Sequence, residues 1–134
     1  MSITDANLHL GRLIPELFPK IFGTNSDQSL DADIVTQRFE ELSATIGKDP
    51  YLVSLGFVKV ANETMCRPIK NLTQSRGFDP KDFILHCFGG AGGQHACAIA
   101  KNLNIRKIFV HKYSGILSAL GISKAKKSKT EIFF

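Results

Sequence analysis

Apolar positions recur every three or four residues through the first half of the chain, which is the pattern of helices packed against a core. The first helix is predicted over residues 5–13, with Thr4 or Asp5 as its cap. The second is predicted over residues 31–46, with a stop at Gly47. Its apolar face consists of Leu30, Ile34, Phe39, Leu42 and Ile46. The first half is therefore expected to be helical.

A longer helix is predicted over residues 50–75. Its apolar stripe consists of Phe57, Ala61, Met65, Ile69 and Leu72. Pro68 lies inside this helix, lacks an N–H donor and clashes with the Thr64 carbonyl, so we expect a kink or a break between Met65 and Pro68. The stripe fits a side facing the core, and it also fits a surface that binds a partner. The pattern leaves both open.

The pattern changes at residues 83–88, where a short and nearly continuous apolar run predicts a strand buried on both faces. A loop at residues 89–93 follows, then a helix over residues 94–103, a second strand over residues 105–110 and a short helix over residues 114–120. A strand, a helix and a strand in this order form a βαβ unit with parallel strands. Two strands make a marginal sheet, which suggests that part of it is missing from this chain.

The loop between the first strand and its helix holds the candidate chemistry. It consists of Gly89, Gly90, Ala91, Gly92 and Gly93. Glycine permits positive φ and close approach of a ligand to the backbone, and the following helix offers free N–H groups to phosphate or ribose oxygens. The spacing departs from GxGxxG, since His95 stands in the place of the third glycine, and from GxxxxGK. A nucleotide-facing loop and a tight turn without a ligand both remain open.

Three polar residues in different parts of the chain each have two interpretations. His95 lies in the first turn of the predicted helix, where its side chain faces a ligand or bonds to the backbone. Asp5 serves as a helix cap, or it contacts metal-bound water or a neighbouring segment. Asn62 faces a site or occupies an ordinary polar position in the long helix.

Composition limits the classes of function. The chain has 134 residues, 43% of them hydrophobic and 22% charged, which suits one ordinary globular domain. Its net charge of +5 is concentrated in the last eleven residues, which hold four lysines, so no basic face for nucleic acid is expected. No apolar run reaches the ~18 residues of a membrane span, and the N-terminus does not look like a signal peptide. We therefore expect a cytoplasmic protein.

Cysteine and histidine spacing argues against a disulfide scaffold and a metal site. The three cysteines, Cys66, Cys87 and Cys97, are an odd number without a framework spacing. His86 precedes Cys87 directly, so on a strand the two side chains point to opposite faces. His95 and Cys97 are two apart, which separates them on a helix. No metal ligand is expected.

Four stretches carry a resemblance to a known family. They are TDANLHLGRLIPELFPKIFG at 4–23, VANETMCRPIKNLTQSRGFDP at 60–80, FGGAGGQHACAIA at 88–100 and VHKYSGILSALGI at 110–122. Over residues 3–123 the chain resembles the hydantoinase A/oxoprolinase family, most closely its eukaryotic, ATP-dependent 5-oxoprolinases. The resemblance implies part of an actin-like (sugar-kinase/Hsp70-like) ATPase domain, an α/β fold with a helical N-terminal half and a βαβ unit.

The resemblance also implies a reaction and its participants. The family opens the lactam of 5-oxo-L-proline to L-glutamate at the expense of ATP, with Mg²⁺ as the expected ion, and belongs to glutathione metabolism. By position, Gly89, Gly90, Ala91 and Gly92 would face the adenosine and α-phosphate of ATP. Gly93 and His95 are expected in the same cofactor site.

The chain also departs from the family pattern. We expect residues 1–123 to form a partial hydantoinase A domain, and residues 124–134 to be a basic tail outside that pattern. The phosphate-binding loop and the hydantoinase B region of the family are absent from this sequence. The remaining hydantoinase A and B regions are thus expected partners, a homo-oligomer is possible, and the chain alone is expected to be inactive. The alternatives are a non-catalytic product that pairs with a full-length chain, and a bare nucleotide-binding module.

Overall fold

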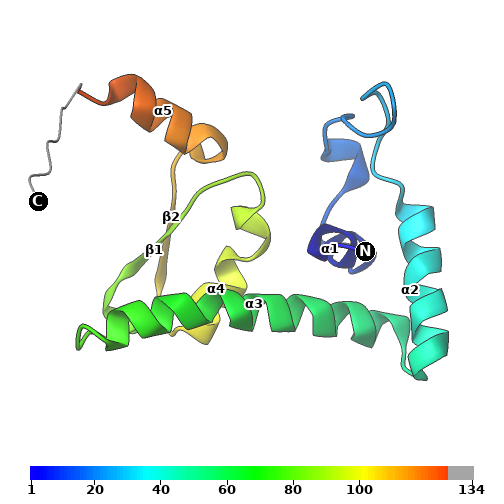
Figure 1. Cartoon of the computed structure of the whole chain (residues 1–134), viewed down its shortest axis with the longest axis horizontal. Helices are drawn as coiled ribbons and strands as arrows, with labels where there is room; N and C mark the ends of the chain where they lie inside the picture. Colours follow the sequence, from blue (N-terminus) through cyan, green and yellow to red (C-terminus); the bar gives the residue numbers. More distant parts are fainter. Residues whose placement is uncertain (127–134) are drawn as a thin grey trace, which may run out of the picture. The chain divides into compact units, whose positions relative to one another are not determined.

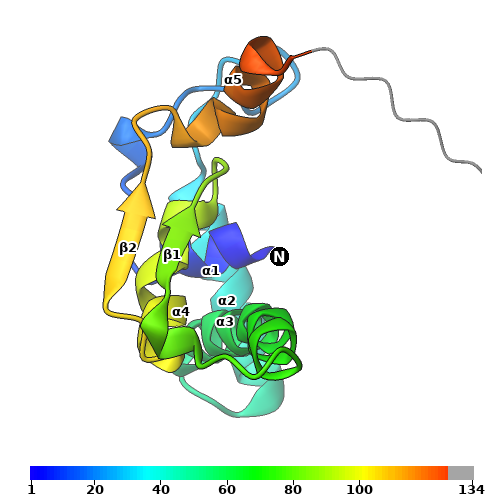
Figure 2. The same cartoon turned by 90° about the vertical axis from the view of Figure 1, so that its left-hand side faces the viewer.

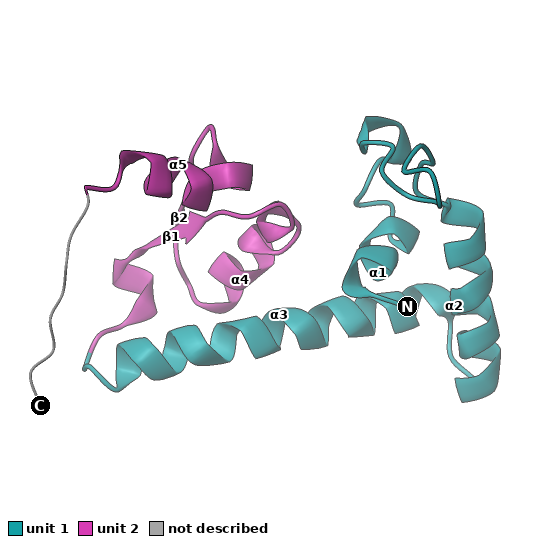
Figure 3. Cartoon of the chain, turned by 45° about the horizontal axis from the view of Figure 1, so that its top comes forward, with its two compact units in different colours: residues 1–77 teal, residues 78–134 magenta. Residues whose placement is uncertain are grey.

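The structure is a computed structural model that describes residues 1–126. It divides into two compact units, Met1–Gly77 and Phe78–Phe134 (Figure 3). We call them the helical unit and the sheet unit. The length of the chain suggests a single core, whereas the structure has two units. The helices of the first half pack on one another and the βαβ segment packs on itself, so each unit has contacts of its own.

The helical unit contains α1 (Ile3–His9), α2 (Ala32–Ile46) and α3 (Pro50–Gln74), with a short 3-10 turn at Pro15–Leu17. Each helix packs against the other two (Figure 1). The buried cluster consists of Ala6, Phe39, Val53 and Val58, surrounded by half-buried Ile3, Leu10, Val35 and Leu42. Phe39 is the largest of these side chains and is fully buried, so it forms the centre of this core.

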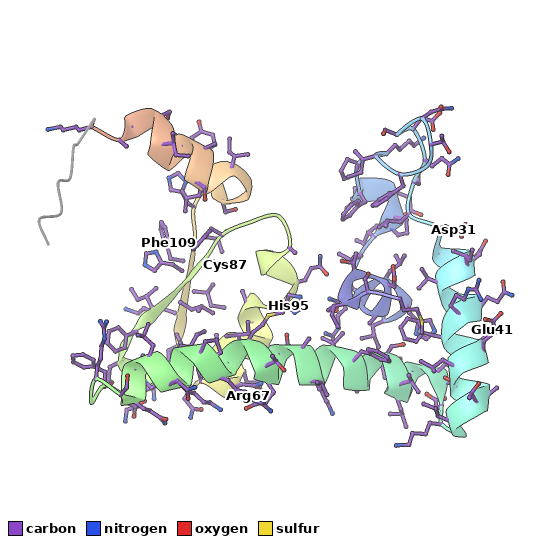
Figure 4. The ribbon with its side chains drawn as sticks, viewed as in Figure 1. Asp31, Glu41, Arg67, Cys87, His95 and Phe109 are labelled. Carbon is purple, nitrogen blue, oxygen red and sulfur yellow. The ribbon has the colours of Figure 1, made fainter. Side chains whose placement is uncertain are left out.

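The helix ends follow capping chemistry. Ser2 caps α1 by accepting the Asp5 N–H at 3.2 Å, and the Asp5 carboxylate accepts the Ser2 N–H at 2.6 Å. The prediction of Thr4 or Asp5 as the cap is therefore wrong, because this reciprocal box satisfies two otherwise free N–H groups together. The predicted ends of α2 are confirmed, with Asp31 as N-cap and Gly47 as a left-handed C-cap (Figure 4).

Helix α3 continues without interruption through Pro68, so a break, the second of the two predicted outcomes, does not occur, and the kink stays a prediction (Figure 1). Proline removes one hydrogen bond and crowds one carbonyl, a local cost of about 3 kcal/mol. The helix spans 25 residues and has the Asp49 side chain as its N-cap, so regular turns on both sides of Pro68 hold it together.

The buried side of α3 differs from the predicted apolar stripe. The buried residues are Val53, Ser54, Val58, Asn62 and Cys66. By contrast Phe57 is 40% exposed, Met65 37% and Leu72 58%. For these three residues the core interpretation of the stripe is wrong, because polar Ser54 and Asn62 lie on the buried side, where hydropathy does not place them. The interpretation as a partner-binding surface stays a prediction. Ser54 is accommodated there by hydrogen bonds to His9 and to the Pro50 carbonyl.

The sheet unit contains β1 (Ile84–Cys87), α4 (Ala96–Asn102), β2 (Lys107–Val110) and α5 (Leu117–Lys124), with 3-10 turns at Pro80–Asp82, Gly92–Gln94 and Ser114–Ile116. The two strands are parallel, with Ile84 opposite Lys107 and Cys87 opposite Val110 (Figure 2). The predicted βαβ unit with parallel strands is confirmed. Both strands and the helix are shorter than predicted.

The strands are less buried than predicted. All four residues of β2 are exposed, and β1 alternates between exposed and half-buried residues. Within the sheet unit α4 packs against both strands and contributes buried Ala96, Ile99 and Ala100. The prediction that β1 is buried on both faces is wrong for this chain, because the described sheet has two strands and one covering helix. Within residues 1–126, none of the helices combines the length and apolar character that crossing a membrane requires.

Candidate nucleotide site

The glycine loop leaves β1 at a residue that needs glycine. Gly89 has a φ of +89°, a left-handed conformation that side chains rarely adopt. Its N–H donates a hydrogen bond of 2.8 Å to the Ser114 carbonyl. Ser114 begins the turn that follows β2 and leads to α5. The hydrogen bond therefore joins the two segments that leave the carboxyl ends of the parallel strands (Figure 2).

A second close approach fixes the far side of the loop. A Cβ atom built on Gly92 would lie 2.9 Å from the Sγ atom of Cys87, the last residue of β1. Figure 4 labels Cys87 at this end of the strand. Real Cβ atoms do not approach this closely, so packing inside the sheet unit already favours glycine at residue 92. Its place in the cofactor site stays a prediction.

The middle of the loop has no comparable internal constraint. Built Cβ atoms on Gly90 and Gly93 meet nothing within 4 Å, and neither residue has a positive φ. In the described part of the chain, the N–H groups of Gly90 and Ala91 donate no hydrogen bond to the backbone. The loop thus offers open space above Gly90 and N–H groups that a ligand oxygen can accept from.

A pocket of about 300 Å³ lies beside the start of this loop. Its lining residues are Phe88, Gly89, Ser114, Gly115, Ile116, Leu117, Ser118 and Ala119. The walls combine apolar side chains with the hydroxyls of Ser114 and Ser118. Apolar walls with few polar groups suit a flat, weakly polar ring such as a purine. The pocket has no cationic lining residue, so it suits a nucleoside better than a triphosphate.

The sequence-based site and this pocket overlap in part. Of the loop residues proposed for ATP, Gly89 lines the pocket, whereas Gly90, Ala91, Gly92 and Gly93 continue away from it. The turn after β2 was missed as part of the site. The signal for it was available, because segments that follow neighbouring parallel strands leave the same edge of a sheet. Ser114 and Gly115 directly follow the second predicted strand in this way.

The helix after the loop begins later than predicted. A 3-10 turn covers Gly92–Gln94, and α4 begins at Ala96 rather than Gln94. The three loop glycines after Gly89 therefore do not stand at the first turn of α4. His95 joins the two helical segments and is only 7% exposed (Figure 4). It makes interactions within the chain and is not among the residues that line the pocket.

The other candidate residues lie elsewhere. Asp5 is used in the α1 cap described above, and Asn62 is buried in α3 with interactions of its own. Cys87 and Cys97 are free thiols, and Cys66 is buried in α3 with interactions of its own. Among residues 1–126, no group of three or more histidine, cysteine or carboxylate side chains is placed to hold a metal ion.

The fold matches several solved structures, two of which are acetone carboxylase and a caprolactamase. The nucleotide-free structure of acetone carboxylase matches with a TM-score of 0.78 and 20% identity, over 93% of this chain and 17% of that chain. The crystal structure of the ATP-dependent caprolactamase from Pseudomonas jessenii matches with a TM-score of 0.75 and 26% identity, over 90% of this chain and 17% of that chain. The predicted fold class is confirmed: the chain has an α/β fold that corresponds to part of an actin-like ATPase domain.

The family follows from sequence. The model of the hydantoinase/oxoprolinase family matches residues 1–131, and the chain belongs to that family. It is 50% identical over 135 residues to the 5-oxoprolinase of Dictyostelium discoideum, covering 93% of this chain and 11% of that protein. It is 52% identical over 128 residues to the 5-oxoprolinase of Saccharomyces cerevisiae, covering 91% of this chain and 10% of that protein. The chain therefore spans about a tenth of the length of these relatives.

Proposed function

We propose that this chain is part of an ATP-dependent 5-oxoprolinase and that it carries the adenosine side of the nucleotide site. The observation that carries the proposal is the pocket between the two loops at the carboxyl ends of β1 and β2, joined by the hydrogen bond from Gly89 to Ser114. Ligands of open α/β sheets bind at this edge. The identity to 5-oxoprolinases supports the choice of 5-oxo-L-proline as substrate.

Each part of the site has a role in this proposal. The apolar walls from Phe88, Ile116 and Leu117 would hold the adenine ring and exclude water from it. The N–H groups of Gly90 and Ala91 would bind ribose or α-phosphate oxygens, since nothing else in the described backbone accepts from them. ATP itself would supply the phosphoryl group that activates the stable lactam carbonyl, with Mg²⁺ balancing the phosphate charge. We assign no Mg²⁺ ligand to this chain.

The remaining parts of the proposal rest on the family. The other hydantoinase A and hydantoinase B regions would supply the γ-phosphate and lactam sites. We propose a cytoplasmic location and a role in glutathione metabolism on the same ground. The isolated 134-residue chain is proposed to lack activity, because a pocket without a cationic lining residue does not stabilise transferring phosphate. Phosphate release that depends on 5-oxoproline, from the purified chain, would show that this part of the proposal is wrong.

The adenosine site can be tested on the chain itself. Half of a site binds weakly, with a Kd of about 1 mM or above, corresponding to about −4 kcal/mol. NMR spectroscopy of the ¹⁵N-labelled chain detects such binding. We expect adenosine to shift amide signals of residues 88–93 and 114–119. In Gly90→Val these shifts should disappear, since the valine side chain fills the open space above the loop. Adenosine shifts that are absent, or that lie elsewhere, would count against the site.

The matched control is Gly121→Val in α5, where a Cβ atom also meets nothing within 4 Å and φ is not positive. It should keep the adenosine response. If Gly121→Val loses the response together with Gly90→Val, the loss reflects general damage to the sheet unit, and the loop is not specifically the binding element.

Two alternatives remain in view. A non-catalytic chain that pairs with a full-length relative would co-purify with that relative when both are expressed together, whether or not it binds adenosine. A bare nucleotide-binding module would bind adenosine and yet add no activity to a relative from which this tenth had been removed. Restoration of activity by this chain would favour the 5-oxoprolinase proposal over both.

A further inference from the structure

A second hollow lies at the opposite end of the sheet unit from the glycine loop. It has a volume of about 720 Å³. Its lining residues are Lys81, Asp82, Ala100, Lys101, Asn104, Ile105 and Arg106. The first two precede β1 and the last two precede β2, so the hollow stands at the amino ends of both parallel strands. The glycine loop stands at the carboxyl ends, and the two places are separate.

Positive charge from three different segments meets in this hollow. Lys81 comes from the turn before β1, Lys101 from the last turn of α4, and Arg106 from the connection to β2. One acidic residue, Asp82, also lines it. In the described part of the chain, Lys101 and Arg106 form no ion pair. The hollow therefore has an excess of positive charge, and concave walls concentrate the resulting potential.

Lys81 forms an ion pair with the carboxylate of Asp79. Its Nζ atom lies 2.6 Å from a carboxylate oxygen of Asp79. This hydrogen bond raises the pKa of the Lys81 ammonium and lowers the pKa of the Asp79 carboxyl group. Lys81 thus remains charged through the neutral range. Both side chains are well exposed, and an exposed pair of this kind is weak, so the Asp79 carboxylate competes only weakly with another anion for Lys81.

The buried residues that line the hollow carry no negative charge that would repel an anion. Ala100 and Ile105 are buried and apolar. Two of the carbonyl groups that end α4 accept hydrogen bonds within the chain: the Ile105 N–H donates to the Ala100 carbonyl at 2.8 Å, and the Asn104 N–H to the Lys101 carbonyl at 3.2 Å. Asn104 adopts the left-handed conformation, with a φ of 57°, that such a helix end requires. Of the charged lining residues, the three cations and Asp82 are all exposed, so the cations outnumber the one carboxylate.

We propose that this hollow binds a small polyoxyanion, a phosphate chain or a polycarboxylate, through Lys81, Lys101 and Arg106. Its volume lies within the range of about 300–1,000 Å³ typical of small-molecule sites. The guanidinium of Arg106 provides paired donors for two oxygens of one group, and the two ammonium groups provide point charges. The proposal is independent of the adenosine site, because no residue is shared between the two.

The test uses the ¹⁵N-labelled 134-residue chain, titrated separately with inorganic tripolyphosphate and with citrate. We expect shifts of amide signals at residues 81–82 and 100–107, with an affinity that falls as salt is added. The double variant Lys101→Gln/Arg106→Gln should bind about five- to tenfold more weakly. A response to tripolyphosphate alone assigns a phosphate ligand, and a response to citrate alone assigns a polycarboxylate; either supports the proposal.

The matched control is Lys59→Gln/Arg67→Gln. It also removes one lysine and one arginine charge, but from exposed positions of α3 (Figure 4). It should bind as the unchanged chain does. Equal weakening in both double variants would mean that net charge alone attracts the anion, and would overturn the proposal. So would shifts spread over the whole chain. Adenosine serves as a third probe, since it carries no phosphate and should leave residues 100–107 unmoved.

Discussion

The Sγ atom of Cys87 occupies the space that a side chain on Gly92 would need. A Cβ atom at residue 92 would come within 2.9 Å of that sulfur. Non-bonded heavy atoms pack at about 3.5–4.0 Å, so one of the two residues must lack a side-chain atom there. Cys87, the last residue of β1, thereby limits which side chains the following loop can carry at residue 92. This packing explains Gly92 without a ligand, whereas Gly90 has no such explanation.

This contact leads to a prediction about stability. Gly92→Ala should destabilise the chain by about 1–3 kcal/mol, because it overpacks the space against the sulfur. Cys87→Ala in the same chain should recover at least half of that loss, since the sulfur is removed. Urea unfolding of the two single variants and the double variant measures the coupling.

The control is Gly93→Ala, where a Cβ atom meets nothing within 4 Å. It should be neutral, or stabilising by up to about 1 kcal/mol through the unfolded chain. If Gly92→Ala is as stable as Gly93→Ala, the contact with Cys87 does not determine the loop.

Phe39 gives a second prediction, for the helical unit. Its side chain is fully buried, stacks on the His9 ring at 4.9 Å and meets the Phe57 ring edge-on at 6.0 Å. Phe39→Ala should cost about 3–5 kcal/mol, a large part of the stability of a small unit. Ile34→Ala on the same helix, 49% exposed, should cost much less. Thermal unfolding of the two variants compares them directly, and equal losses would contradict this core.

The pair formed by Ser54 and His9 gives a third prediction. The Ser54 hydroxyl lies 2.7 Å from His9 Nδ1 and donates to the Pro50 carbonyl at 3.0 Å. A hydroxyl has one hydrogen, so if Ser54 gives that hydrogen to the Pro50 carbonyl, the hydrogen of the second bond belongs to His9 Nδ1. We expect ¹⁵N NMR to show the Nδ1-H tautomer of the neutral His9 ring. A neutral ring protonated on Nε2 alone would contradict this hydrogen-bond network.

Ser54→Ala tests the same pair energetically. The variant leaves the Nδ1–H of His9 without its partner, at a cost of about 1–3 kcal/mol. Thr36→Ala is the control, because the Thr36 hydroxyl bonds to the Ala32 carbonyl on an exposed side of α2. We expect its effect on the free energy of unfolding to stay within about 0.5 kcal/mol.

Much of the fold could be predicted from local signals. The ends of α2 follow from Asp31 and Gly47, and the βαβ unit follows from two apolar runs around a glycine loop. The buried side of α3 could not be read from hydropathy. Ser54 is buried because it finds partners in His9 and Pro50, and His9 lies far from it in sequence. The burial of such a residue depends on a tertiary hydrogen bond that periodicity does not reveal.

The site was predictable in outline and not in detail. The run of glycines marked the loop, yet each glycine is required for a different reason. Gly89 has a positive φ, and Gly92 lies against the sulfur of Cys87. Neither reason applies to Gly90. The parallel strands could have placed Ser114 near the loop, but its hydrogen bond with Gly89 could not be read from the sequence. The exposure of β2 likewise depends on which elements cover it, and the apolar pattern of a strand does not record that.

The central claim is that the pocket beside Gly89 holds the adenine ring, and intermolecular NOE measurements test it most directly. The labelled chain and adenosine should give NOEs between the adenine protons and the methyl groups of Ile116 and Leu117, which line the pocket. The helical unit offers a competing apolar groove that includes Leu52 and Val60. NOEs to those methyl groups, and none to Ile116 or Leu117, would contradict the account.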